Sequence, residues 1–161
     1  MYKNIKLIVA FAIAVLSISY VDAQSFNEDK TNFANFMKRM YNASEYEGVK
    51  IVDDYDHQYL VSLLSLEKAK YQNPSQMNRV AQMKAQSQAS TFLNGSTISL
   101  ETVIKTSERV DSTNQKSSII ETVETIKENA MGFSQGLELL TSFDNIDGKR
   151  VVFIYMRELK K

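Results

Sequence analysis

The fold of this chain is limited above all by the pattern near its C-terminal end, where two strand-like segments flank a tight turn. Asp147-Gly148 is a strong signal for a hairpin turn, and it separates Leu137–Phe143 from Arg150–Leu159. In the second segment, both alternating sets of side chains are largely apolar. This pattern is typical of an inner strand that is covered on both faces, and not of an edge strand.

The clearest helix begins at Asn73-Pro74. Asn73 can cap it, Pro74 suits its first position, and Gln76 can complete a capping box. Asn94-Gly95 ends it, with Gly95 available for a left-handed cap. Its apolar face consists of residues at helical spacing: Met77, Val80, Ala81, Ala85, Ala89 and Phe92. Because the alanines lie four residues apart, this face can approach a sheet closely.

Three further segments have strand character. Val49–Val52 and Tyr59–Leu66 are apolar and partly alternating, and the polar residues 53–57 connect them. Thr97–Val110 is rich in β-branched residues, and its alternation allows one face to be buried. The strands and the helix at Asn73 together predict an α+β fold with a mixed or mostly antiparallel sheet and one long helix packed on a face.

Residues 118–130 fit either a helix or a strand. Their apolar spacing fits a helix, whereas their β-branched content fits a strand. We favour a strand paired with Thr97–Val110, because the polar residues 111–117 between two β-branched runs indicate a hairpin. A bend with two glycines is expected at Met131–Gly136.

An additional helix is predicted for Gln24–Glu47, with Gly48 as its stop. Its aromatic and methionine side chains share one face: Phe33, Phe36, Met37, Met40 and Tyr41. We interpret this stripe as core packing. A partner-binding helix is the alternative.

The first residues have the order of parts of a secretory signal peptide. Lys3 and Lys6 precede an apolar run from Leu7 to Ile18, and cleavage is expected after Ala23. The alternative, a transmembrane anchor, needs about 20 apolar residues, and the run is shorter. We therefore divide the chain into a signal peptide (1–23), an N-terminal helical segment (24–48) and an α+β domain (49–161).

Charge and cysteine content exclude several classes of function. Removal of residues 1–23 takes two lysines and one aspartate from 19 basic and 19 acidic residues, which leaves a net charge of −1. A near-neutral domain lacks the clustered basic residues that nucleic acids or anionic lipids require. The absence of cysteine excludes disulfides, a thiol nucleophile and Cys-containing zinc sites. It also leads us to expect no lipid anchor.

His57 is the only histidine and the best candidate for a metal or general-base site. Asp53, Asp54 and Asp56 surround it, and a histidine with carboxylates can bind divalent cations. A lone histidine is a weak ligand set, so we interpret these residues as a solvated polar loop.

Two other motifs are interpreted structurally. Asp144–Gly148 resembles a calcium loop but lacks the downstream glutamate, so a hairpin turn is expected. Gly132–Gly136 has no lysine and no third glycine, which argues against a phosphate-binding loop. The sequence contains no Gly-x-Ser-x-Gly motif. We therefore predict no catalytic, cofactor-binding or metal-binding residues, no cofactor and no enzymatic activity.

Four pieces of the chain between Asn78 and Tyr155 form a recognisable layout: Arg79–Ala85 leading to Phe92–Gly95, then Ile98–Thr102, Gly136–Leu140, and Asp147-Gly148 before the last strand. With this layout, about half of the chain resembles the lipoprotein-20 type of envelope proteins. The flagellar outer-membrane lipoprotein P and the amino-terminal domain of flagellar assembly protein T share this layout. The resemblance implies a compact, non-catalytic α+β domain in the cell envelope.

The sequence therefore predicts a non-catalytic protein, secreted or periplasmic, with a binding or structural role. Its expected partner is an unknown envelope protein or a second copy of the chain. No transmembrane span is expected after removal of the signal peptide. One alternative is a subunit of a larger surface assembly, and another is a small metal-dependent hydrolase that uses His57 with Asp54 and Asp56.

Overall fold

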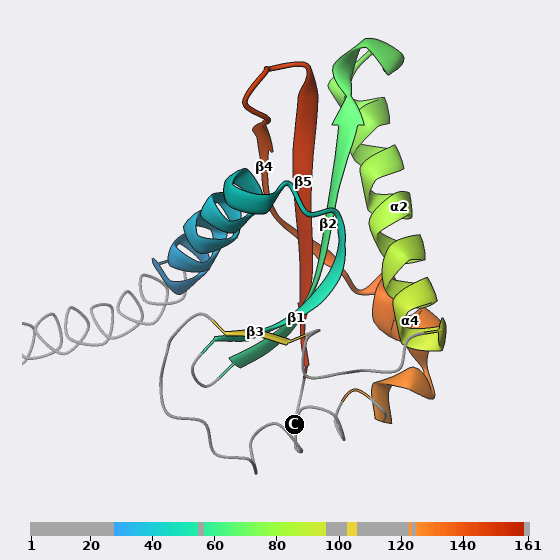
Figure 1. Cartoon of the computed structure of the whole chain (residues 1–161). Helices are drawn as coiled ribbons and strands as arrows, with labels where there is room; N and C mark the ends of the chain where they lie inside the picture. Colours follow the sequence, from blue (N-terminus) through green and yellow to red (C-terminus); the bar gives the residue numbers. More distant parts are fainter. Residues whose placement is uncertain (1–27, 55–56, 96–102, 106–122, 124, 160–161) are drawn as a thin grey trace, which may run out of the picture. The chain divides into compact units, whose positions relative to one another are not determined.

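The computed structural model describes residues 28–54, 57–95, 103–105, 123 and 125–159 (Figure 1). The predicted signal peptide and its cleavage site lie outside these residues. The chain divides into two compact units, residues 1–38 and 39–161. Each is described by itself.

Residues 28–44 are helical, which confirms the predicted N-terminal helix over its described part. Within the first unit, Phe33 and Met37 of the apolar stripe are buried. The helix ends before the predicted stop, because Glu45 adopts a left-handed conformation (φ 47°) and its N–H donates to the carbonyl of Tyr41. Gly48 instead begins the first strand.

Five strands of the second unit form one mixed sheet with the order β3-β1-β2-β5-β4 (Figure 1). Their bounds are β1 (Gly48–Asp54), β2 (His57–Glu67), β3 (Val103–Lys105), β4 (Glu138–Asp144) and β5 (Arg150–Glu158). The pairs β1–β2, β2–β5 and β4–β5 are antiparallel, and β1–β3 is parallel. The predicted α+β class with a mostly antiparallel sheet is thus confirmed.

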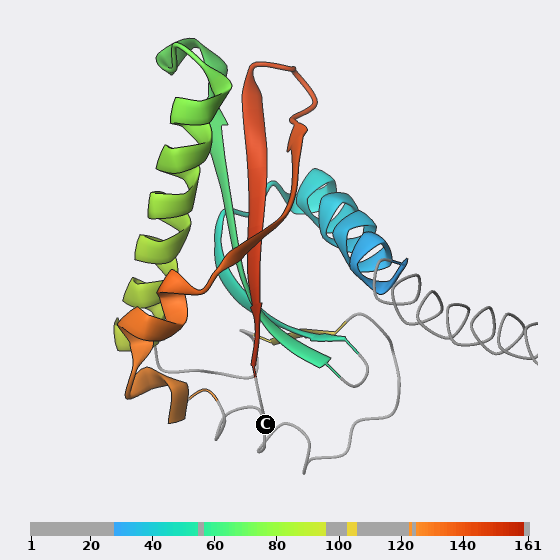
Figure 2. The same cartoon turned by 180° about the vertical axis from the view of Figure 1, so that it is seen from behind.

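The long helix α2 (Pro74–Gly95) packs on one face of the sheet. The short helix α4 (Ala130–Gln135) lies beside α2 when viewed from either side (Figures 1 and 2), and a 3-10 turn, η1 (Lys68–Lys70), follows β2. The hydrophobic core under α2 contains its buried side chains Met77, Ala81, Ala85, Ala89 and Leu93. They pack with residues of β1, β2 and β5, which include Ile51, Leu64 and Phe153. The predicted alanine face is therefore the face that meets the sheet.

The interior position predicted for the last strand is also confirmed. β5 lies between β2 and β4, and Phe153 and Tyr155 face the core under α2. The alternate residues Val152, Ile154 and Met156 are buried as well. The alternation of side chains along a strand explains why both sets had to be apolar.

Several local predictions were wrong. Val123 and residues 125–127 are helical, so a strand is ruled out for the described part of 118–130. Val123 and Ile126 pack at helical spacing against the core that contains α2, and residues 118–122 and 124 lie outside the described residues. The expected bend at Met131–Gly136 is largely the helix α4, which Asn129 caps by accepting a hydrogen bond from the N–H of Gly132.

The third strand also differs from its prediction. Within Thr97–Val110, only residues 103–105 are described, and they form β3. β3 pairs with β1 in parallel, instead of with residues 118–130 in a hairpin. The polar loop predicted at residues 111–117 lies outside the described residues.

The two ends of α2 were predicted with unequal success. The Asn73 side chain accepts a hydrogen bond of 2.8 Å from the N–H of Gln76, as expected for an N-cap. The Gln76 side chain accepts from the N–H of Gln72, so the capping box is shifted by one residue. Gly95 remains helical and does not take the left-handed conformation that was predicted.

Candidate functional site

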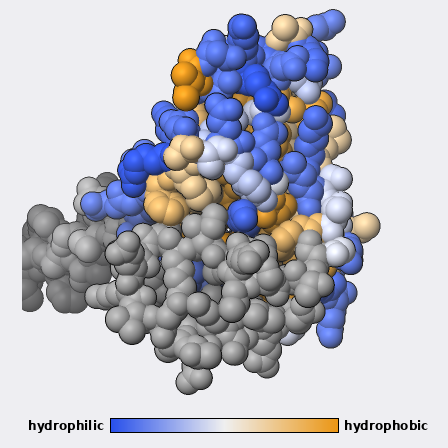
Figure 3. Space-filling view, in the orientation of Figure 1, coloured by the Kyte–Doolittle hydropathy of each residue, from blue (hydrophilic) through white to orange (hydrophobic). Residues whose placement is uncertain are grey.

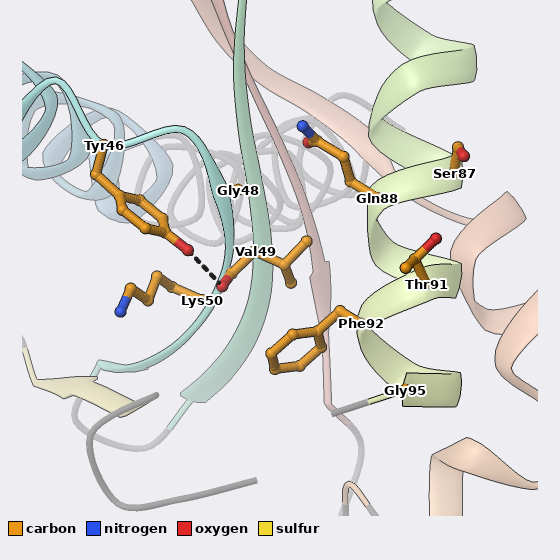
Figure 4. A pocket seen from close by; sticks show the side chains of 9 residues that line it. All are labelled: Tyr46, Gly48, Val49, Lys50, Ser87, Gln88, Thr91, Phe92 and Gly95. Atoms are coloured by element: carbon orange, nitrogen blue, oxygen red, sulfur yellow. Dashed lines mark hydrogen bonds between the residues drawn. The ribbon is translucent and has the colours of Figure 1, made fainter. Parts of the chain in front are cut away.

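An open groove of about 660 Å³ runs between β1 and α2 (Figure 4). Ligand pockets in proteins commonly enclose about 300–1,000 Å³, so the groove has the size of a small-molecule site. Gln88 and Phe92 project into it from α2, and Val49 faces Phe92 from β1. The lining residues are Tyr46, Gly48, Val49, Lys50, Ser87, Gln88, Thr91, Phe92 and Gly95.

Tyr46 and Gly48 shape the strand side of the groove. The Tyr46 hydroxyl donates a hydrogen bond of 3.1 Å to the carbonyl of Val49 (Figure 4). This arrangement requires glycine at position 48, because Gly48 has φ +134° and a Cβ there would lie 2.6 Å from the Tyr46 hydroxyl oxygen. Burial raises the pKa of Tyr46 above its ordinary value.

Lys50 lies at the strand edge of the groove, next to Tyr46. Its Nζ lies 4.7 Å from the centroid of the Tyr46 ring, within the range of a cation–π contact. Among the described residues that line the groove, Lys50 is the one charged side chain. In Figure 4 the Lys50 side chain runs away from Gln88 and Phe92, on the side of β1 where Tyr46 lies, so its ammonium group does not point toward α2.

The helix side of the groove is polar and connected to the sheet. Ser62 of β2 is fully buried, and its hydroxyl donates a hydrogen bond of 2.8 Å to Oε1 of Gln88. This bond holds the Gln88 side chain across the space between helix and strand. Phe92, one helical turn further on, packs partly against the hydrophobic core and leaves the rest of its ring in the groove.

The structure places His57 away from the groove, at the start of β2. Its Nδ1 lies 2.8 Å from Oε1 of Glu158 on β5, and both side chains are about half exposed (58% and 48%). Asp54 ends β1 and is the register partner of His57, and Asp53 pairs with Gln58, so these residues belong to strands instead of the predicted loop. The pairing between β1 and β2 therefore continues two residues beyond Val52, the predicted end of the first strand. Asp56 lies outside the described residues.

No metal centre is found in the described part of the chain, where no three His, Cys, Asp or Glu side chains are grouped to hold an ion. The Asp144–Gly148 segment forms the hairpin turn between β4 and β5, as predicted. Asn145 Oδ1 accepts from the N–H of Arg150 and Asp147 Oδ1 accepts from the N–H of Lys149, whereas Asp144 Oδ2 lies 2.8 Å from Nζ of Lys68.

A second polar cluster joins the end of the N-terminal helix to the sheet. Within the second unit, Ser65 donates a short hydrogen bond to Glu47 Oε1, which Arg150 Nη2 approaches to 3.3 Å. Tyr41 also bonds Ser65 and contacts the edge of the Phe143 ring. Burial raises the pKa of Tyr41, and the Ser65 hydrogen bond partly offsets this effect. The cluster connects four segments of the chain, and we interpret it as structural.

Sequence reasoning missed the groove. It assigned Phe92 to the packing face of α2 and gave no role to Gln88 or Lys50. A signal for Tyr46 was present in the Tyr-x-Gly spacing, but only the positive φ of Gly48 shows why the glycine is needed.

Comparison of the chain with protein-family models, curated proteins and solved structures gives no match. The resemblance to the lipoprotein-20 type of envelope proteins therefore stays a prediction. None of the helices in the described residues is long and apolar enough to cross a membrane.

Proposed function

We propose that this chain is a non-catalytic, exported cell-envelope protein that binds a small ligand in the groove between β1 and α2. The groove carries the proposal. It is built from a rigid helix and a strand, its volume is about 660 Å³, and it combines apolar surface with a few oriented polar groups. Such a combination is typical of ligand sites.

The chemistry of the groove supports binding over catalysis. Its two titratable side chains contact each other, with the Lys50 ammonium over the Tyr46 ring and the Tyr46 hydroxyl bonded to Val49. Its central polar side chain, Gln88, does not exchange protons near neutral pH. These groups can orient a ligand, and they offer it no nucleophile paired with a base.

The described surface also carries isolated apolar side chains. On the face seen in Figure 3, the described residues are mostly hydrophilic, with scattered apolar side chains. Among the residues that the structure describes, the large exposed apolar side chains are Met83, Met131, Leu139 and Ile146. Single exposed apolar residues are normal on protein surfaces and do not by themselves indicate a binding site.

Amide NMR spectra of the isotope-labelled protein, recorded with mixtures of small organic molecules, test the proposal. We expect binding molecules to shift the amide signals of Gly48, Val49, Gln88 and Phe92 together. A Thr91→Trp variant should fill the groove and abolish these shifts, whereas Gln82→Trp, on an exposed part of α2, should leave them unchanged. Shifts that cluster elsewhere, or no shifts at all, would contradict the proposed function.

A further inference from the structure

Residues from both faces of β1 line the groove. The Val49 side chain faces Phe92 on α2, whereas the Lys50 side chain leaves β1 on the opposite side, with Tyr46 (Figure 4). Side chains alternate between the two faces of a strand, so a space that touches both faces must open onto the edge of that strand. The groove therefore reaches the main chain of β1 at Gly48–Lys50.

The strand pairing shows which main-chain groups point out of this edge. The N–H of Leu159 donates to the carbonyl of Gln58, so the even-numbered residues of β2 face β5 and its odd-numbered residues face β1. The odd-numbered residues of β2 are in register with Gly48, Lys50 and the other even-numbered residues of β1. The N–H and the carbonyl of Val49 therefore point away from β2.

The neighbouring strand β3 does not reach Val49. The three residues of β3 are in register with Ile51–Asp53. The Val49 carbonyl accepts from the Tyr46 hydroxyl, whereas no described residue of β3 lies beside the Val49 N–H. Strand edges with unpaired main-chain groups are templates for another extended chain. The edge thus offers a main-chain donor to a partner that enters the groove.

The groove also has room for a side chain next to this edge. In a strand added beside β1, alternate side chains would turn toward α2. Phe92 is only partly buried and faces Val49 across the groove (Figure 4). An apolar side chain placed between them would lose contact with water on both sides, which favours binding.

We propose that the groove binds a short peptide in an extended conformation, which adds a strand to β1 beside Val49. A carbonyl of the peptide accepts from the Val49 N–H, and an apolar side chain of the peptide lies between Val49 and Phe92. In recognition by strand addition, main-chain hydrogen bonds give affinity and pockets for alternate side chains give specificity. This inference rests on the proposed function and adds the ligand class to it.

Amide hydrogen exchange, followed by NMR, tests the contact at one atom. The probe is acetyl-Thr-Val-Thr-Leu-Thr-amide, an uncharged peptide whose alternating residues suit a strand. Exchange of the Val49 amide should slow about tenfold at a peptide concentration of about ten times Kd, since exchange then occurs from the free fraction of the protein. The amides of Gly48 and Lys50 face β2 and should exchange as before. Acetyl-Leu-amide, which has a side chain but no strand, should leave the exchange of Val49 unchanged at the same concentration.

Val49→Pro is the decisive variant. Proline removes the outward N–H and is tolerated in a strand where that group faces away from the neighbouring strand. Binding of the pentapeptide, measured by the shift of the Phe92 amide signal, should weaken about fivefold, which corresponds to the loss of one hydrogen bond. Val49→Thr keeps the N–H and the shape of the side chain, so it should bind the peptide as the wild type does. The exchange experiment on the wild type does not depend on the folding of either variant.

The possible results separate the two proposals. If the pentapeptide shifts the groove signals while the Val49 amide exchanges as fast as before, the groove holds side chains only and the peptide class is wrong. If the Val49 amide is already protected without peptide, the edge is paired within the chain or with a second copy, and the inference is overturned. If the pentapeptide shifts no groove signal at millimolar concentration, the inference is also overturned. In all three cases the proposed function depends on the independent screen with mixed small molecules.

Discussion

Ala85→Leu tests the contact between α2 and the sheet, which forms one wall of the core and holds one side of the groove. Ala85 is fully buried and lies between Ala81 and Ala89, which are fully buried too. Leucine adds three carbon atoms at this point. If a space existed there, burying them would stabilise the fold by roughly 2 kcal/mol, at about 0.8 kcal/mol per carbon.

The close packing of the alanine face predicts the opposite sign. Overpacking of a filled core costs about 1–3 kcal/mol, because neighbouring side chains and backbone must move. With a urea m-value of about 2 kcal/mol/M, the unfolding midpoint should fall by about 0.5–1.5 M. Urea unfolding followed by circular dichroism measures this change.

Gln82→Leu is the matched control, because Gln82 is exposed on α2 and both residue types are good helix formers. It should unfold within about 0.5 kcal/mol of the wild type. If Ala85→Leu unfolds at or above the wild-type midpoint while Gln82→Leu loses stability, α2 is rotated from the orientation described here and the reasoning fails.

Four further predictions follow from individual residues. The exported protein should have lost residues 1–23, and an intact mass that still includes Ala23 and the residues before it would refute cleavage there. His57→Ala should change stability by no more than about 0.5 kcal/mol in urea unfolding, because the contact between His57 and Glu158 is about half exposed. Gly48→Ala should cost about 1–3 kcal/mol, since φ is +134° and the new Cβ meets the Tyr46 hydroxyl; an unchanged thermal midpoint would contradict this. Burial raises the pKa of Tyr46 and Tyr155, so the folded state keeps protons that the unfolded state releases. Stability should be unaffected below about pH 10 and fall as pH rises through the raised pKa values, with tyrosinate absorbance appearing late in the titration.

Local signals predicted the elements that depend on few neighbours. Asn73 caps α2, and Asp147-Gly148 turns the last hairpin, because both act through hydrogen bonds or dihedral angles within a few residues. The interior position of β5 was also predictable, because the alternation of side chains along a strand can be read from neighbouring residues, and both alternating sets of β5 are apolar.

Predictions that required distant partners failed. Val123 and Ile126 fit both periods, and only their packing against the core that contains α2 decides for a helix. The parallel pairing of β3 with β1 joins residues about 50 positions apart, which no local pattern encodes. The groove was missed for the same reason, because it forms where Gly48–Lys50 and the end of α2 meet.

The pairing of β2 with β5 has a consequence for the order in which the chain can fold. Glu67 and its partner Arg150 are about 80 residues apart along the chain, and closing such a loop costs roughly 4 kcal/mol of entropy before the contacts form. β1 can pair with β2 through a short connection, whereas the opposite edge of β2 has no partner until β5 has been synthesised.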